Sequence, residues 1–474
     1  MTKFVDAMRT DDVTTTNGMP AHSSTLDMCL DLFSSVGGMR GQEKQSVINL
    51  FVKAFDENPL TAMKILFWTR DVRGGAGERQ IFKDIVEYLA NTRPNVLSKN
   101  VSLIPEYGRW DDMFVLFGTS VEDVALTVVT DALKSGNQLC AKWCPRPNTK
   151  NANDKAVVSA IRKRMKLTPK EYRKLLVINT DVVEQLMCAN NWTAVEYQKL
   201  PSKAMADYAS AFRKRDALRY DEYLDLVESG EVKINTGAVY PYNVLNMLRN
   251  GDMKAANTMW KNLPDYMEGN NERVIPVVDV SGSMDCPAGG NPSITCMDVA
   301  ISLGLYISER NIGDFKDAFI TFSAQPKLQY LKGNLNERYN QLGSAEWGMN
   351  TNLEAVFELI LDKAKASNLS ETEMPTMVLI LSDMQFDSGV RYNGNAQTMI
   401  SKQYEANGYK MPKVVYWNIS DYGNKPAQKH QSGAAMVSGF SPSLLKSLLS
   451  GEDLSPLSMM MKVIGNSRYD AVVA

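Results

Sequence analysis

Three oxygen-bearing side chains follow an apolar segment a little past the middle of the chain. Asp279, Ser281 and Ser283 alternate in the string Asp-Val-Ser-Gly-Ser, and two later residues offer the same kind of oxygen. Thr351 lies just before a helical pattern, and Asp383 ends another apolar run. Carboxylates and hydroxyls are the oxygen ligands that a hard cation such as Mg²⁺ takes, and Mg²⁺ keeps several waters as well. The five residues therefore predict a divalent-cation site, with Mg²⁺ as the expected ion.

Two other interpretations of this spacing remain open. Serines and aspartates also cap strand ends without binding anything, and a short motif of common residues arises by chance in long chains. A phosphatase with an aspartyl nucleophile would use an aspartate after its first strand, but it usually has a second aspartate two residues later, where this chain has Ser281. The chain has only two histidines, and its glycine-rich string at 73–77 lacks the Gly-Lys-Ser/Thr ending of a phosphate-binding loop. We therefore expect a binding protein and not an enzyme.

The elements that must position these residues alternate between strands and helices. Continuous apolar runs predict strands buried on both faces at residues 274–280, 316–323, 376–383 and 413–420. Helical patterns lie between them at 297–310 and 352–366. This alternation predicts a doubly wound, mostly parallel sheet of the Rossmann-like α/β class. Functional residues of such sheets collect beyond the carboxyl ends of the strands, where Asp279 and Asp383 lie.

The first half of the chain has a different pattern. Apolar side chains at helical spacing predict helices at residues 45–55, 60–69 and 80–91. Thr168 and Glu171 form a capping box that predicts another helix start. Consecutive helices with short polar corners favour a HEAT-like α-helical solenoid or ring, and an irregular helical bundle is the alternative that the sequence leaves open.

The chain is too long for one ordinary core, so we expect more than one domain. The predicted divisions are a flexible N-terminus at 1–24, a helical-repeat domain at 25–268 and an α/β domain at 269–474. The fold class is thus α plus α/β. Hydrophobic residues make up 44% and charged residues 22%, as in soluble globular proteins. Apolar runs too short for a membrane span predict no membrane partner, and six cysteines without a disulfide framework predict a cytoplasmic location.

A basic segment stands out in the helical half. Residues 142–174 contain eleven Lys or Arg and two acids, a local charge of +9 in a chain whose total is −2. Such a concentration is the electrostatic footprint of phosphate binding. Trp143 and Tyr172 are candidates for stacking on bases. A solvated helix face accounts equally well for the charges. The predicted RNA-binding residues are Lys142, Arg146, Lys150, Arg162, Lys163, Arg164, Lys166, Arg173 and Lys174.

The five oxygen-bearing residues, in this order, resemble the metal-ion-dependent adhesion site of von Willebrand factor A domains. That family has the pattern D-x-S-x-S, then a threonine before a helix, then an aspartate after a later strand. The third loop departs from the family, because Asp383 stands in Ser-Asp-Met and not in the common Thr-Asp-Gly. The resemblance implies a Mg²⁺ site with one open position, which a carboxylate from a protein partner completes. It does not imply catalysis.

The order of the two halves is similar to that of the TROVE-module Ro RNA-binding proteins. Strings similar to a Ro-related family cover roughly residues 25–470, for example at 67–82, 103–117 and 201–212. This resemblance implies a ring or crescent of paired helices closed by the A domain. Our first hypothesis is therefore a non-enzymatic ribonucleoprotein scaffold that holds structured or single-stranded noncoding RNA. The second is an assembly module whose metal site captures an acidic residue of a protein partner and which binds no RNA.

Two charged strings in the helical half leave their role open. The string at 70–79 contains Arg70, Arg73 and Arg79, which lie near a corner of the ring by analogy with Ro-like proteins. These arginines either contact RNA or pair with Asp71 and Glu78 and hold two helices together. The string at 107–112 leaves the same choice open, because Arg109 has Asp111 and Asp112 as possible internal partners.

Overall fold

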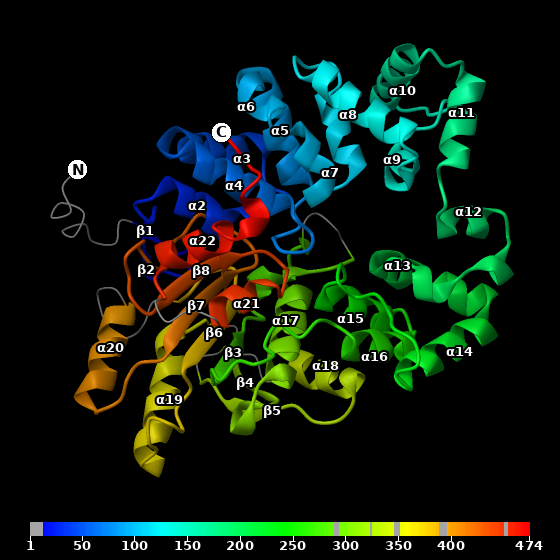
Figure 1. The fold of residues 1–474 in the computed structure, drawn as a ribbon. Helices are drawn as coiled ribbons and strands as arrows, with labels where there is room; N and C mark the ends of the chain where they lie inside the picture. Colours follow the sequence, from blue (N-terminus) through cyan, green and yellow to red (C-terminus); the bar gives the residue numbers. More distant parts are fainter. Residues whose placement is uncertain (1–12, 289–292, 323–324, 346–350, 388–395, 450–453) are drawn as a thin grey trace. The chain divides into compact units, whose positions relative to one another are not determined.

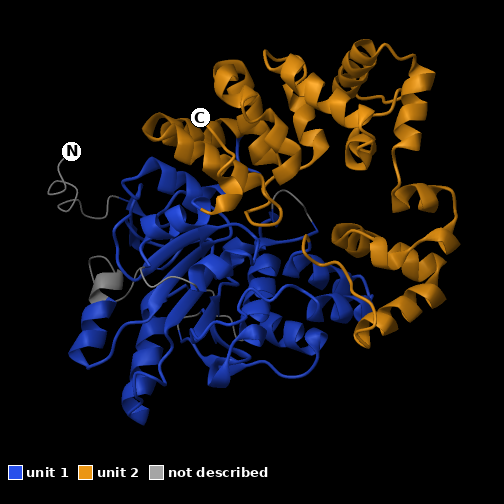
Figure 2. Ribbon diagram, viewed as in Figure 1, with its two compact units in different colours: residues 1–43, 239–465 blue, residues 44–238, 466–474 orange. Residues whose placement is uncertain are grey.

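The computed structural model describes residues 13–288, 293–322, 325–345, 351–387, 396–449 and 454–474 (Figure 1). The chain folds into two compact units (Figure 2). The sheet unit comprises residues 1–43 and 239–465, and the helical unit comprises residues 44–238 and 466–474. The chain thus combines α and α/β structure, as predicted. The units are discontinuous, however, because each consists of two separate stretches of the chain.

The sheet unit is built on six strands in the order β5-β4-β3-β6-β7-β8. Neighbouring strands run parallel, except that β5 pairs with β4 in the antiparallel direction. All four predicted strands are confirmed as β3, β4, β6 and β7, whereas β5 and β8 were missed. The strand bounds are β3 Val274–Val278, β4 Ala318–Thr321, β5 Leu328–Tyr330, β6 Met377–Ser382, β7 Lys413–Asn418 and β8 Ala434–Ser438.

Helices cover both faces of this sheet. The helix α17 (Cys296–Arg310) follows β3 and leads to β4, whereas α19 (Leu353–Ser367) precedes β6 on the other side of β3. Right-handed crossovers in opposite directions along a sheet place their helices on opposite faces. The helix α17 packs directly on β3. This contact holds the end of β3, and with it Asp279, against a fully packed helix.

Glycine at position 304 allows this close approach. A Cβ at Gly304 would lie 2.4 Å from Cγ2 of Val278, the last residue of β3. We expect Gly304→Ala to lower the free energy of unfolding by about 1–3 kcal/mol, because overpacking forces side chains and backbone to shift. Gly343→Ala is the matched control, since no atom lies within 4 Å of the Cβ it would add. Chemical denaturation measures both, and equal stability of the two variants would contradict this packing.

Residues 13–24 of the N-terminal segment belong to the sheet unit, which corrects that part of the flexible terminus predicted over residues 1–24. Residues 1–12 lie outside the described residues, but β1 (Val13–Thr14) and β2 (Pro20–Ala21) pair with each other. The helix α2 (Met28–Val36) follows and packs against β8, where Ser438 Oγ donates to the carbonyl of Phe33 at 2.8 Å. These contacts join residues about four hundred positions apart, which no local sequence pattern encodes.

The boundary predicted at residues 268/269 also differs from the structure. The helices α15 (Pro241–Arg249) and α16 (Met253–Lys261) belong to the sheet unit, because α15 packs on α17. Arg249 Nη1 and Asp298 Oδ2 form an ion pair at 2.7 Å across this contact. The remaining helices of the sheet unit are α18 Leu335–Gly343, α20 Ala396–Ala406, α21 Leu444–Leu449 and α22 Pro456–Ile464.

The helical unit consists of successive helices that pack on their neighbours, and the helices predicted at 45–55, 60–69 and 80–91 are confirmed as α3, α4 and α5. The predicted capping box is present at the start of α11, with Thr168 and Glu171 as its members. The main helices are α3 Lys44–Glu57, α4 Pro59–Arg70, α5 Gln80–Thr92, α6 Pro94–Ser98, α7 Ile104–Tyr107, α8 Glu122–Lys134, α9 Gln138–Trp143, α10 Ala152–Met165, α11 Pro169–Ile178, α12 Val183–Cys188, α13 Ser202–Arg215 and α14 Ala217–Glu228.

A buried ion pair lies inside the helical unit. Arg70 Nε donates to Asp112 Oδ2 at 2.6 Å, and both side chains are buried. Arg79 also pairs with Asp112, at 3.3 Å, while Arg109 pairs with Asp111 at 3.1 Å. Ion pairs inside the helical unit therefore connect the charged segment at 70–79 to the charged segment at 107–112. Arg73 is exposed.

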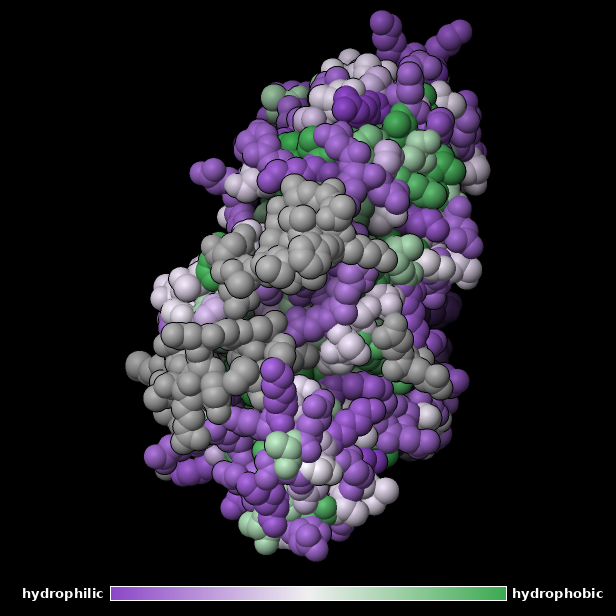
Figure 3. Space-filling model, turned by 90° about the vertical axis from the view of Figure 1, so that its left-hand side faces the viewer, coloured by the Kyte–Doolittle hydropathy of each residue, from purple (hydrophilic) through white to green (hydrophobic). Residues whose placement is uncertain are grey.

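No helix among the described residues is long and apolar enough to span a membrane. On the face shown in Figure 3, hydrophilic residues cover most of the described surface, and the hydrophobic residues form small separate areas.

Candidate metal centre

The carboxyl ends of β3 and β6 lie side by side at the point where the strand order reverses. Numbered in sequence, the six strands run 3-2-1-4-5-6, so that β3 and β6 are the adjacent first and fourth strands. In sheets of this order, ligands bind in the crevice beyond these two strand ends. Asp279 follows β3, Asp383 follows β6, and the amide of Asp279 donates to the carbonyl of Leu381 at 2.9 Å. The structure thus places both predicted carboxylates at this switch point.

Asp279 is fully buried and held by the residues around it. Its Oδ1 accepts the Ser281 amide at 2.9 Å, and its Oδ2 accepts the Ser382 hydroxyl at 2.6 Å. Burial raises the pKa of Asp279, and these hydrogen bonds act in the opposite direction. Ser382 was not predicted as part of the site, although it directly precedes Asp383 in the sequence. Its role is to orient the carboxylate of Asp279.

Asp383 has a buried oxygen without a partner. Its Oδ1 accepts the Gln385 amide at 3.1 Å, whereas its Oδ2 is buried and has no hydrogen-bond partner among the described residues. Burial, followed by the negative charge of Asp279, raises the pKa of Asp383 to about 6, against the lowering effect of the Ser283 hydroxyl. If both of these buried carboxyl groups are ionised, they repel each other. A divalent cation would relieve that repulsion.

The residue after Asp383 has a backbone conformation that glycine favours. Met384 has a φ of +64°, the left-handed conformation in which a glycine is comfortable. The third loop of this chain thus adopts a glycine-type conformation with a buried methionine.

The hydroxyls of the motif lie on the solvent side of the carboxylates. Ser281 Oγ and Ser283 Oγ are 3.0 Å apart, and Ser283 is exposed. Thr351 is buried immediately before α19, as predicted, and its hydroxyl donates to the carbonyl of Gln385 at 2.8 Å. The amide of Thr351 donates to Asp387 Oδ2 at 2.5 Å, which ties the threonine to the Asp383 loop.

The N-terminal segment also reaches this loop, which the sequence did not indicate. Asn17 Nδ2 donates to the carbonyl of Gln385 at 2.7 Å and lies 3.5 Å from Thr351 Oγ1. The Thr15 hydroxyl donates to the carbonyl of Phe386 at 2.5 Å. Asn17 is thus a polar neighbour of the candidate site that sequence reasoning missed, because it lies more than three hundred residues away.

The chemistry of this set of residues fits a hard cation. No three acid, histidine or cysteine side chains cluster as metal ligands in the described part of the chain, so the set depends on hydroxyl oxygens. Two carboxylates would neutralise the charge of one Mg²⁺, and the paired serine hydroxyls would supply neutral oxygen ligands. A bound cation would also give the buried Oδ2 of Asp383 the polar partner that it lacks among the described residues.

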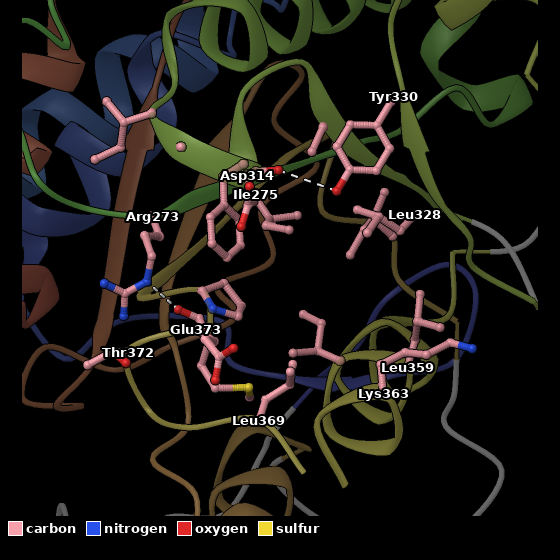
Figure 4. Close-up of a pocket in the computed structure, with 18 of the residues that line it drawn as sticks. Arg273, Ile275, Asp314, Leu328, Tyr330, Leu359, Lys363, Leu369, Thr372 and Glu373 are labelled. Carbon is pink, nitrogen blue, oxygen red and sulfur yellow. Dashed lines mark hydrogen bonds between the residues drawn. The ribbon is translucent and has the colours of Figure 1, made fainter. Parts of the chain in front are cut away.

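A separate cavity lies near the opposite end of β3 (Figure 4). Its volume is about 520 Å³, and none of the five predicted ligands lines it. Apolar side chains dominate the lining, and Arg273 turns away from it to donate to the carbonyl of Met374 at 2.6 Å. The cavity is therefore distinct from the candidate metal centre.

The predicted RNA-binding residues lie on α9, α10 and α11 and on the segments that connect these helices. Lys142 pairs with Glu184 at 2.9 Å, and Arg164 forms an ion pair with Asp123. The exposed cations of the predicted set are Lys150, Lys163, Arg164, Lys166, Arg173 and Lys174, whereas Lys142, Arg146 and Arg162 are half-buried.

The two aromatic side chains predicted to stack on bases differ in solvent exposure. Tyr172 is fully buried, and its hydroxyl donates to the carbonyl of Pro145, which corrects the prediction for this residue. Trp143 remains partly exposed, but the guanidinium of Arg109 lies 4.0 Å from its ring centroid. Tyr172 and Leu176 form the buried face of α11, and their i, i+4 spacing is the sequence signal that could have identified Tyr172 as a core residue.

Comparison with known proteins gives two family matches. The domain of unknown function DUF2828 matches residues 15–137 and 150–275, and the domain of unknown function DUF7788 matches residues 273–467. An uncharacterised protein of Acanthamoeba polyphaga mimivirus is 30% identical over 510 residues, which cover 95% of this chain and 86% of that protein. The two matches meet at residues 273–275, directly before β3.

Proposed function

This chain belongs to the DUF2828 family, and from its candidate metal centre we propose that it is a non-enzymatic scaffold whose sheet unit binds a protein partner through Mg²⁺. In this proposal the sheet unit is a von Willebrand factor A-like domain. Asp279, Ser281, Ser283, Thr351 and Asp383 form its metal-ion-dependent adhesion site. The doubly wound strand order supports this assignment, because it places Asp279 and Asp383 after the adjacent strands β3 and β6.

One observation carries the proposal. Asp383 Oδ2 is buried at the switch point without a hydrogen-bond partner among the described residues, beside a second buried carboxylate, Asp279. Two adjacent buried carboxylates with an unsatisfied oxygen are costly in an apolar environment unless a positive charge compensates them. A bound Mg²⁺ supplies that charge.

The site would present the cation to a partner on its hydroxyl side. Ser283 is exposed, whereas the carboxylates of Asp279 and Asp383 are buried. A partner would therefore approach past the serine hydroxyls and complete the coordination with a carboxylate of its own. No group in the site is placed as a nucleophile or a proton donor in this proposal, so we expect binding without turnover.

Partner capture should depend on both Mg²⁺ and the buried carboxylate. We expect proteins bound by the wild-type chain in Mg²⁺ to be released by a chelator, and the double variant Asp279→Ala/Ser281→Ala to capture none of them. Asp285→Ala is the matched control, because Asp285 is an exposed acid of the same loop. Quantitative mass spectrometry of the chelator eluates measures the effect. Equal capture by the double variant and the control would contradict the proposal.

The helical unit supports a second candidate function, the binding of RNA by a HEAT-like, TROVE-related scaffold. Its supporting observation is the series of exposed cations on and next to α10 and α11, which includes Lys163 and Lys166. Phosphates bound by such cations release counterions, which makes the affinity fall with salt. Noncoding RNA, structured or single-stranded, is the partner that this surface would take.

A pair of lysines tests the RNA interpretation. We expect Lys163→Ala/Lys166→Ala to weaken binding of oligouridine at low salt and to reduce the slope of log affinity against log salt by about 1.5, since each lost phosphate contact removes about 0.7 to 0.9. Lys214→Ala/Arg215→Ala is the control, because it removes two exposed cations from α13 of the same unit. Fluorescence anisotropy measures both. An equal loss of affinity in the control variant would mean that the attraction between protein and RNA is nonspecific. Absence of RNA binding by the wild type at low salt would overturn this function.

A further inference from the structure

Two cysteine side chains meet beside the loop that carries Ser281 and Ser283. The Sγ atoms of Cys286 and Cys296 are 3.3 Å apart, and both cysteines are free thiols. Cys286 lies just beyond the short 3₁₀ turn Gly282–Asp285, and Cys296 is the first residue of α17. The contact therefore joins two elements that flank the candidate metal centre.

The backbone holds these cysteines in a geometry that a disulfide can take. Pro287 and Thr295 form an antiparallel bridge, and the amide of Cys296 donates to the carbonyl of Cys286 at 2.9 Å. Cys286 and Cys296 are thus directly opposite each other, next to that bridge. Opposed residues of this hydrogen-bonded kind have Cα atoms about 5.5 Å apart. That separation is within the range of about 4.4–6.8 Å found for disulfides, so that side-chain rotation brings the sulfurs to bonding distance.

The two thiols differ in accessibility. Cys286 is half-buried and open to a small reagent, whereas Cys296 is buried. Burial, together with the hydrogen bond to Cys286, raises the pKa of the Cys296 thiol. Cys286 is therefore the side chain that a soluble oxidant meets first, and Cys296 lies behind it at contact distance. An accessible thiol backed by a second one is the arrangement of a reversible redox site.

We propose that Cys286 and Cys296 form a reversible disulfide site whose oxidant is a low-molecular-weight disulfide such as glutathione disulfide. The Cys286 thiolate attacks one sulfur of glutathione disulfide, which breaks the S–S bond and releases one glutathione thiolate. The Cys296 thiolate then attacks the sulfur of Cys286 and releases the second glutathione. The two cysteine protons pass to the two glutathione thiolates, so two thiols are oxidised and one disulfide is reduced.

The other cysteine pair of the chain provides an internal comparison. Cys140 and Cys144 are also neighbours, at the end of α9, but both are buried. Glutathione disulfide has no access to buried thiols in the folded protein. Cys188, by contrast, is exposed and would form mixed disulfides by itself. It is therefore best removed before thiols are counted.

The test uses the full chain with Cys188→Ser, which leaves five of the six cysteines. After treatment with glutathione disulfide, followed by denaturation and then alkylation, we expect three free thiols, a peptide cross-link between Cys286 and Cys296, and recovery of five thiols with dithiothreitol. In the same background, Cys296→Ser should trap glutathione on Cys286, and Cys286→Ser should form neither product. Five alkylated thiols after treatment, or as much bound glutathione in Cys286→Ser as in Cys296→Ser, would overturn the proposal.

Discussion

Mg²⁺ should raise the melting temperature of the wild-type chain, and the increase should vanish in Asp279→Asn. A ligand that binds only the folded state stabilises it by about 2.7 kcal/mol when its free concentration is one hundred times its dissociation constant. For a unit of this size, that corresponds to an increase of about 5–10 °C. The physical reason is that the cation removes the repulsion between the buried carboxylates of Asp279 and Asp383.

The control separates the site from the bulk effect of salt. Asp285→Asn removes an exposed acid of the same loop and should keep the full increase in melting temperature. Differential scanning calorimetry in Mg²⁺ and in chelator, at constant ionic strength, measures all three proteins. If Mg²⁺ stabilised Asp279→Asn as much as the wild type, the cation would be acting elsewhere.

Arg70→Met should destabilise the helical unit by about 3 kcal/mol, because it leaves Asp112 as a buried carboxylate that has lost its buried partner. Removing one member of a buried ion pair typically costs about 3–5 kcal/mol. We place the effect at the lower end, because Arg79 and Lys83 still face Asp112 at 3.3 and 3.8 Å. The melting temperature should fall by about 6–12 °C.

The exposed Arg73, three residues further on, provides the control, and Arg73→Met should leave stability nearly unchanged. A double-mutant cycle with Asp112→Leu should show a coupling above about 1 kcal/mol, because the two side chains share a hydrogen bond at 2.6 Å. Additive effects within about 0.5 kcal/mol would mean that the pair is energetically independent.

The sequence predicted the parts of the fold that local patterns encode. β3 and β6 are continuous apolar runs, which buried parallel strands require. The sequence alone could therefore place Asp279 and Asp383 at strand ends. Thr351 could be placed before a helix for a similar reason, since α19 has an amphipathic stripe. The strand β5 was not predicted, because it is three residues long and its Leu328 and Tyr330 side chains are exposed.

The rest depends on contacts between residues far apart in the chain. Ser35 and Asp421 are hydrogen-bonded at 3.0 Å, and Asn17 reaches the loop after Asp383, although both pairs are separated by more than three hundred and fifty residues. No periodicity or capping pattern reports such pairings, so the N-terminal segment was assigned to a flexible terminus. The meeting of Cys286 and Cys296 was invisible for the same reason, because it depends on an antiparallel bridge and not on a spacing motif.

Titration with Mn²⁺, followed by electron paramagnetic resonance, tests the metal centre most directly. Free Mn²⁺ gives a signal that falls when the ion binds, so the method counts sites without reference to any partner. We expect one site per chain in the wild type and in Asp285→Asn, displacement by Mg²⁺, and no binding by Asp279→Asn. A wild-type chain that leaves the Mn²⁺ signal unchanged, or a variant Asp279→Asn that binds Mn²⁺ as the wild type does, would contradict the metal centre proposed at the ends of β3 and β6.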